Sequence, residues 1–202
     1  MKDPTERRVR VWDPFVRVFH WTLVIAFFVA FVTEGEQATL HELAGYVVGG
    51  LVVVRFVWGF VGTRHARFAD FVYRPAAVLA YGLRLVTFRS ERYLGHSPLG
   101  GAMVVALLVC LALTVGTGIL TDQRGEGREE ATLVTTALAD EDEEGKDERE
   151  REVRESALSE IHEVLANLTF LLVILHVGGV ILASLAHREN LVRAMFTGDK
   201  RA

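Results

Sequence analysis

The sequence predicts an all-α protein, a four-helix transmembrane bundle with both termini on the cytoplasmic side. Half of the 202 residues are hydrophobic and the mean hydropathy is +0.27, although 24% of the residues are charged. Charged residues are nearly absent from four stretches, each close to the ~20 residues that span a bilayer. Four such helices leave too little amphipathic sequence to cover them in a soluble core. We therefore expect one membrane-integral domain over residues 1–202.

The first two stretches, about residues 15–33 and 43–61, predict two helices joined by a short acidic connection. Arg17 and His20 lie within the first stretch, and no A-x-A-like site precedes a polar mature segment. A cleavable signal peptide is therefore the less favoured alternative. Arg55 lies within the apolar part of the second stretch, where an unpaired charge is unfavourable.

The other two stretches, about residues 99–120 and 161–186, predict the third and fourth helices. From Asp122 to Glu160 the chain has fifteen Asp or Glu and six Lys or Arg residues, a net charge of minus nine. We expect residues 121–160 to form an acidic loop, and such runs are usually solvated and partly disordered. A docking surface for a basic partner is the alternative. The helix-prone sequence before Ile161 would also allow the fourth helix to extend beyond the membrane.

The distribution of basic residues predicts the orientation of the helices. Lys and Arg gather in the N-terminal segment, in the connection between the second and third stretches, and in the C-terminal segment. The other two connections are acidic. Because cytoplasmic flanks carry the excess of basic residues, we expect both termini inside and the acidic segment 121–160 in the periplasm.

Four histidines lie inside or at the ends of the apolar stretches. The predicted topology places His41 and His162 at the outer end, and His20 and His176 nearer the cytoplasm. Fourteen residues separate the two histidines of the fourth helix, about 21 Å and close to four whole turns. Imidazole is the usual axial ligand of haem iron. We therefore predict two haem sites, one with His41 paired to His162 and one with His20 paired to His176.

The inner pair fits the predicted depths less well than the outer pair. His20 comes about five residues into its helix, whereas His176 stands about eleven residues before the inner end. Pairing His20 with His187 is the competing assignment, but His187 lies in the basic segment HREN and is expected to be solvated. His65 and His96 lie in a basic connection and are expected at the surface.

Arg55 comes fourteen residues after His41 on a helix that runs in the same direction as the fourth, so we expect it level with His176. No Asp or Glu occupies a matching depth, and a haem propionate is the anionic partner we predict. The alternative is that Arg55 snorkels to the inner interface past Trp58.

The single cysteine, Cys110, narrows the choice of cofactor. It excludes covalent haem attachment through C-x-x-C-H and cysteine-ligated iron–sulfur clusters, which leaves two non-covalent b haems. A zinc site needs three or four ligands at one depth, and two separated pairs do not supply them.

Several segments carry a resemblance to a known family: VWDPFVRVFHW, LHELAGY, RFVWGFVGTRHARFADF, IHEVLANL and LHVGGV. On these segments the chain resembles the bacterial cytochrome b561 family, including the cytochrome b subunits of nickel–iron hydrogenases. The resemblance covers almost all of the chain apart from the acidic insert. It implies a bacterial inner-membrane protein, two b haems and exchange with ubiquinone or menaquinone. The ligands it implies are the same four histidines: His20, His41, His162 and His176.

Two histidines on each iron leave no open axial position, which favours electron transfer over stand-alone bond chemistry. We predict a dihaem cytochrome that carries electrons between the quinone pool and a periplasmic partner. This partner is a cytochrome c or a dehydrogenase subunit that docks on the acidic loop. A membrane-anchor subunit of a hydrogenase or dehydrogenase, a superoxide:quinone oxidoreductase, and a cofactor-free transporter with a histidine proton relay are the alternatives. Glu42 and Glu160 are candidate proton acceptors, although carboxylates at helix starts are more often caps. No nucleic acid is expected as a partner.

Overall fold

The computed structural model describes residues 8–35, 37–135 and 141–202, and of residues 122–152 it describes only the backbone and the side chain of Arg149. The described secondary structure is helical apart from two three-residue strands. Its elements are β1 (Arg8–Arg10), α1 (Pro14–Val32), α2 (Ala38–Val61), a 3₁₀ turn η1 (Arg64–Ala66), α3 (Phe68–Phe71), α4 (Pro75–Val86), α5 (Pro98–Thr135), α6 (Glu141–Ala186), α7 (Leu191–Thr197) and β2 (Asp199–Arg201).

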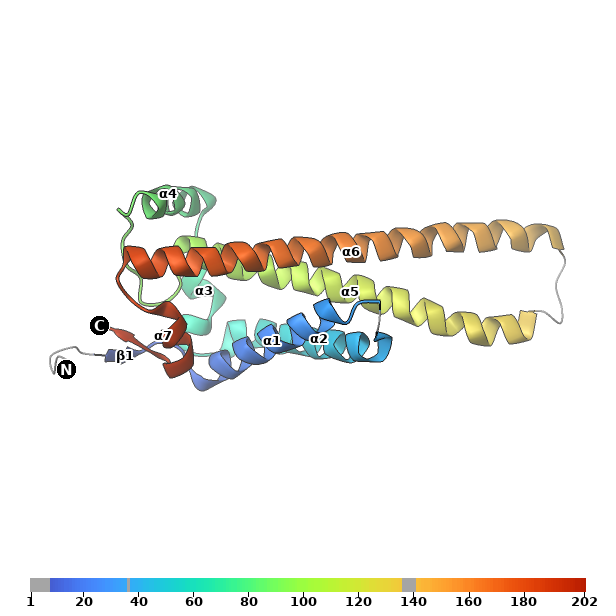
Figure 1. Ribbon diagram of the computed structural model, residues 1–202, viewed down its shortest axis with the longest axis horizontal. Coiled ribbons are helices and arrows are strands. Elements are labelled where there is room, and N and C mark those ends of the chain that lie inside the picture. Colours follow the sequence, from blue (N-terminus) through green and yellow to red (C-terminus); the bar gives the residue numbers. More distant parts are fainter. Residues whose placement is uncertain (1–7, 36, 136–140) are drawn as a thin grey trace.

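Among the described residues, four helices are long and apolar enough to cross a membrane. They are α1, α2, the Pro98–Thr121 part of α5 and the Val153–Ala186 part of α6. α5 packs along α6, α1 packs against α2, and α2 also contacts α5 (Figure 1). The all-α fold with four long apolar helices is therefore confirmed, and it is consistent with a transmembrane bundle.

Local sequence explains where the helices start. Asp13 caps α1, because its carboxylate accepts a hydrogen bond from the Val16 backbone N–H at 2.8 Å, and Pro14 occupies the first helical position. α2 begins at Ala38, five residues before the apolar run that predicted it. His41 consequently lies in the first turn of α2.

α5 and α6 continue past the ends of α1 and α2 as a long hairpin (Figure 1). The segment expected as a loop, 121–160, is helical up to Thr135 and again from Glu141. Most of the acidic side chains of the predicted docking surface lie outside the described residues.

The two strands hold the chain ends together. β1 and β2 pair antiparallel, with Arg8 opposite Arg201 and Val9 opposite Lys200. This pairing puts both ends of the described chain at the same end of the bundle (Figure 1). The assignment of that end to the cytoplasm rests on the distribution of basic residues and stays a prediction.

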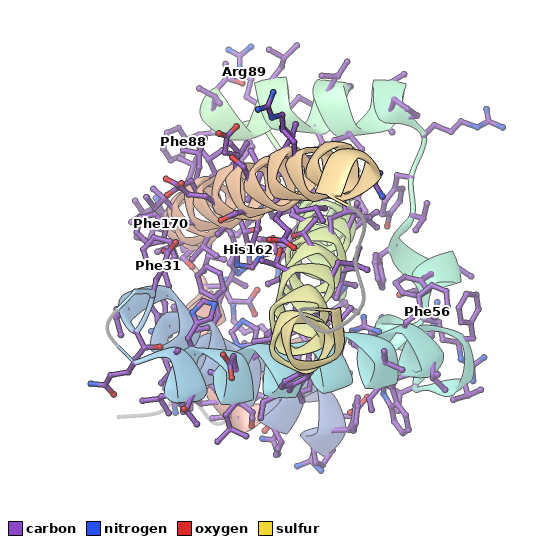
Figure 2. All side chains as sticks on the ribbon, turned by 90° about the vertical axis from the view of Figure 1, so that its right-hand side faces the viewer. Phe31, Phe56, Phe88, Arg89, His162 and Phe170 are labelled. Atoms are coloured by element: carbon purple, nitrogen blue, oxygen red, sulfur yellow. The ribbon has the colours of Figure 1, made fainter. Side chains whose placement is uncertain are left out.

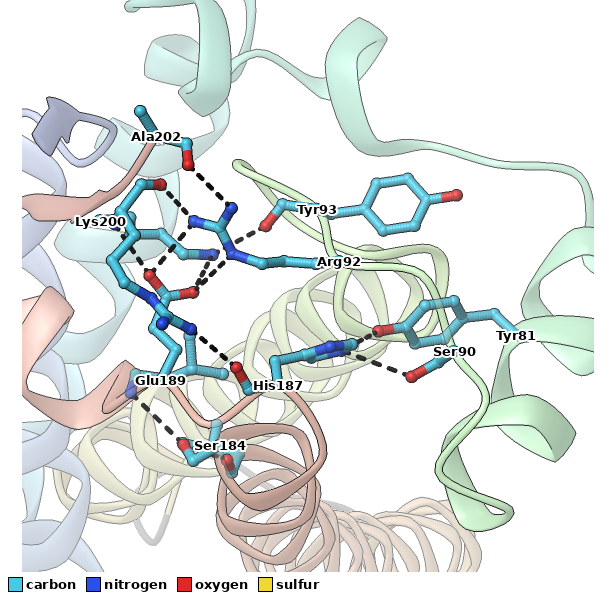
Figure 3. Close-up of polar contacts among 12 residues, drawn as sticks. Tyr81, Ser90, Arg92, Tyr93, Ser184, His187, Glu189, Lys200 and Ala202 are labelled. Carbon is cyan, nitrogen blue, oxygen red and sulfur yellow. Dashed lines mark hydrogen bonds and ion pairs between the residues drawn. The ribbon is translucent and has the colours of Figure 1, made fainter. Parts of the chain in front are cut away.

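A polar network holds the C-terminal segment at the end of the bundle where the chain termini lie (Figure 1 and Figure 3). Glu189 is buried and accepts hydrogen bonds from the Arg92 guanidinium at 3.2 and 3.4 Å and from the Arg201 backbone N–H at 3.0 Å. Lys200, also buried, lies 3.8 Å from the same carboxylate and donates to the Tyr93 carbonyl at 2.9 Å. We call these residues the terminal network.

Candidate functional site

His41 and His162 face each other at the end of the bundle opposite the chain termini. His41 comes from the first turn of α2 and His162 from the middle of α6, and their ring centroids are 6.0 Å apart. The rings are nearly perpendicular, with an interplanar angle of 76°. The structure therefore brings together the predicted outer pair.

Backbone carbonyls orient both rings of this pair. Nδ1 of His41 lies 2.8 Å from the Ala30 carbonyl oxygen, and Nδ1 of His162 lies 2.9 Å from that of Thr114. Because a carbonyl oxygen only accepts, each Nδ1 carries the proton and donates it. In the neutral rings Nε2 then keeps its lone pair, which is the arrangement that metal-bound histidines commonly have.

A partly open cavity of about 110 Å³ is lined by both rings. Its lining includes both histidines and is otherwise mainly apolar, with two carboxylates, Glu34 and Glu42. Gly118 lets α5 approach the His162 ring, since a Cβ there would lie 3.0 Å from Cε1 of that ring. Figure 2 shows His162 on the side of α6 that faces α5. The donor set of this cavity, two facing imidazoles in a mainly apolar lining, fits a haem.

His20 and His176 form the second pair, from α1 and α6. Their ring centroids are 6.4 Å apart at an interplanar angle of 54°. His20 also makes an edge contact with Trp21, at 5.1 Å between centroids. Its Nδ1 is buried and has no hydrogen-bond partner among the described residues.

Both separations suit two imidazoles on one iron. With metal–nitrogen bonds of about 2 Å and roughly 1 Å from each nitrogen to its ring centre, two axial imidazoles have centroids about 6 Å apart. Direct stacking of the rings would bring them closer, and a hydrogen bond between them would leave no room for a metal. Both histidine pairs therefore fit ligation of one iron each. The Nδ1 atom of His20, in the inner pair, lacks the backbone carbonyl contact that orients each outer ring.

Arg55 is buried, with 3% of its surface exposed, and extends toward the end of the bundle where the chain termini lie. It donates from Nη2 to the Ala66 carbonyl at 3.1 Å, and its guanidinium lies 5.4 Å from the Phe68 ring centroid and 5.9 Å from that of Phe71. Nη1 is also buried and has no hydrogen-bond partner in the described part of the chain. This donor is available to an anionic group such as a propionate.

The surface position expected for His96 is wrong. Its ring lies between Trp12 and Phe71, at centroid distances of 4.7 and 4.6 Å, and its Nδ1 is buried. Burial lowers the pKa of His96 to about 3, and the positive charges of Arg55 and Lys200 add to this, so His96 is neutral near pH 7. The sequence did not reveal this packing, because Trp12 and Phe71 are both distant from His96 along the chain.

His65 and His187 are also held by polar partners rather than freely solvated. Nδ1 of His65 lies 2.9 Å from a carboxylate oxygen of Asp70. Nε2 of His187 is within hydrogen-bond distance of the Tyr81 hydroxyl at 3.3 Å and the Ser90 hydroxyl at 3.4 Å (Figure 3). His187 therefore faces α4, whereas His20 faces His176.

A family model described as prokaryotic cytochrome b561 matches residues 11–198, nearly the whole chain. The chain belongs to the prokaryotic cytochrome b561 family. The resemblance seen in the sequence is thereby confirmed, and membership implies a multi-pass membrane b-type cytochrome involved in electron transfer. No curated protein and no solved structure matches the chain.

The family indicates the class of cofactor. Within the described ranges no group of three or more His, Cys, Asp or Glu side chains could hold a metal ion, as a zinc site would need. The cytochrome b561 family instead suggests haem b. Sequence reasoning selected the four histidines, but it missed Glu34 in the outer cavity and the backbone carbonyls that orient the outer rings.

Proposed function

We propose that the chain is a dihaem b-type cytochrome of the bacterial inner membrane that passes electrons between the quinone pool and a periplasmic partner. The observation that carries the proposal is the presence of two imidazole pairs, at centroid separations of 6.0 and 6.4 Å, within a b-type cytochrome family. Haem, when bound, supplies reversible one-electron chemistry. His41 with His162 would hold one haem, and His20 with His176 would hold the other.

The chain's own groups set the environment of each site. The Ala30 and Thr114 carbonyls hold Nδ1–H of the outer histidines, which fixes the rings and increases the basicity of Nε2. At the inner end, the buried guanidinium of Arg55 would pair with a propionate through Nη1. This contact would supply the anion that a buried arginine requires.

The outer cavity offers groups that can accept protons. Glu34 and Glu42 line it, and Glu160 is exposed on α6 half a turn before His162. Oxidation of a quinol releases protons, and carboxylates beside the electron acceptor can take them up. Glu42 would accept a proton from the quinol. The net charge of minus nine in segment 122–160 supports a cationic partner on this side.

Proteoliposomes that contain the purified cytochrome test the electron path. We expect a short-chain ubiquinol or menaquinol to reduce the haem, seen in its absorption bands, and an added basic cytochrome c to reoxidise it. Failure of both quinols to reduce haem in folded protein would refute the quinone assignment. If a metalloenzyme copurifies and is needed for reoxidation, the chain is a membrane-anchor subunit and does not use a soluble partner. Rapid reduction of the haem by superoxide alone would favour a self-contained oxidoreductase.

A further inference from the structure

α4 is a short helix in the connection between α2 and α5. It is apolar, but its twelve residues are too few to span a bilayer. It packs beside α5 and α6 at the end of the bundle where the chain termini lie (Figure 1). In the view along the bundle, α4 runs across the axis of the long helices (Figure 2). This is the orientation of a helix that lies along a membrane surface.

α4 has two apolar faces, and the bundle covers only one. Tyr81 and Leu85, four residues apart, are buried against the bundle. Leu79, Leu83 and Val86 have the spacing i, i+4, i+7 and form a separate stripe. Their exposed fractions are 70%, 74% and 66%. We call these three residues the open face of α4.

Cationic side chains flank the open face. Arg74 precedes α4, Arg84 lies in its last turn and Arg89 comes after it, and all three are exposed. In the part of the chain that the structure describes, none of them forms an ion pair. At 100° per residue, Arg84 points about 140° away from Leu79. A helix beside the bundle could therefore bury Leu79 in acyl chains and still expose Arg84 to headgroups.

We propose that α4 is an interfacial helix that binds anionic phospholipids of the leaflet on the side of the chain termini. The open face inserts among the acyl chains, and the three arginines bind headgroup phosphates. Arginine suits this contact because its planar group of donors binds phosphate at two points. Three features argue for lipid as the occupant: the charge complementarity, the crosswise orientation, and the position of α4 at the end of the four apolar spans. The proposal does not depend on haem.

The depth of α4 is testable with single spin labels in nanodiscs of phosphatidylethanolamine with a minority of phosphatidylglycerol. Leu83→Cys and Arg84→Cys would be labelled in a Cys110→Ser background. We expect the label at position 83 to be accessible to oxygen and protected from a water-soluble nickel complex, and the label at position 84 to show the reverse. Equal exposure of both labels to the nickel complex would refute insertion. Protection of position 83 from both reagents in a dimer would assign the open face to a second copy instead.

Native mass spectrometry of the same nanodisc preparation tests the headgroup contact. Each surface arginine contributes roughly a five-fold preference for an anionic lipid. We expect the amount of phosphatidylglycerol retained by R84Q/R89Q to be lower than that of the parent protein by a factor of about ten or more. The matched control is R188Q/R193Q, which removes two exposed arginines from the same end of the molecule. Equal losses in both variants, or no loss in either, would contradict a site on α4.

Discussion

The carbonyl oxygens of Ala30 and Thr114 decide which nitrogen of each outer histidine is free. By accepting the Nδ1–H of His41 and of His162, they leave the lone pair of Nε2 in both rings available to bind a metal. No sequence pattern announces such a contact, because a backbone carbonyl belongs to every residue. The histidines themselves were predictable, since an ionisable residue within an apolar span needs a function.

Gly118 provides a test of the outer site that leaves its ligands unchanged. The side chain of Gly118→Val would collide with the His162 ring, since even a Cβ would lie 3.0 Å from Cε1. We expect about ten- to a hundred-fold weaker haem binding at this site, the range typical when ligand orientation is disturbed. Redox titration would then show only the inner haem.

Gly116→Val is the matched control, because a Cβ at Gly116 meets nothing within 4 Å. It should keep both haems. Equal haem loss in the two variants would mean that helix α5, rather than the position of His162, is responsible.

Arg55 allows a test of the inner site. Removing its positive charge in Arg55→Gln should make reduction of a nearby haem less favourable and lower its midpoint potential. We expect a shift on the order of tens of millivolts, since 59 mV corresponds to a tenfold change for one electron. Potentiometric titration should show the shift in one haem only. Arg64→Gln, at an exposed position of the same end, serves as control, and an unchanged potential in Arg55→Gln would contradict the propionate contact.

At the scale of elements, hydropathy was enough to predict the four long helices, whereas elements that depend on tertiary contacts were missed. The four apolar runs correspond to α1, α2, and parts of α5 and α6. The boundaries differ because helices continue into polar sequence, as α2 does from Ala38 and α6 from Glu141. α4, α7 and the β1–β2 pair were not predicted. Hydropathy does not reveal elements this short: α7 has a local N-cap, Asn190, but only seven residues, and the strand pair depends on the distant residue Glu189.

The terminal network should make the folded chain ends sensitive to acid. Burial raises the pKa of Glu189, but hydrogen bonds from Arg92 and the Arg201 N–H, together with Lys200, outweigh this and hold it below 4.5. A lowered carboxyl pKa contributes stability that is present above the ordinary pKa and lost as pH falls through the folded value. We expect the hydrogen-exchange protection factors of the β2 amides, relative to the intrinsic rates, to fall as pH falls below about 4.5.

Glu189→Gln is the comparison for this prediction. It should show low protection in β2 already near neutral pH. Any further loss of protection in this variant as pH falls from 6.5 toward 3 reports the lowered pKa of His96 at the same end. Wild-type-like protection in Glu189→Gln at neutral pH would show that the carboxylate does not hold the strand.

At the scale of the whole molecule, charge is divided between the two ends. Basic residues flank the end with the chain termini, and the hairpin of α5 and α6 carries the acidic segment. Such an asymmetry orients a protein in the membrane and gives opposite potentials at its two surfaces. Electrons that cross between these surfaces would pass from one histidine pair to the other along α6, which contributes one member to each.

The acidic hairpin should accelerate encounter with a cationic electron carrier. We expect the second-order rate of oxidation by a basic cytochrome c to fall steeply with ionic strength. The variant E141Q/D142N/E143Q/E144Q should lower the rate several-fold at low salt and weaken the salt dependence. A rate that is independent of both salt and these charges would remove the hairpin as a docking surface.

The central claim is that each histidine pair holds one haem. Its most direct test is haem stoichiometry by pyridine haemochrome, with reduced-minus-oxidised spectra, for the parent protein and the variants His41→Ala, His176→Ala and His187→Ala. We predict two b haems per chain in the parent and in His187→Ala, and one in each of the other variants, with a different spectral component lost from each. Folded parent protein without haem, or loss of the same component from His41→Ala and His176→Ala, would contradict the claim.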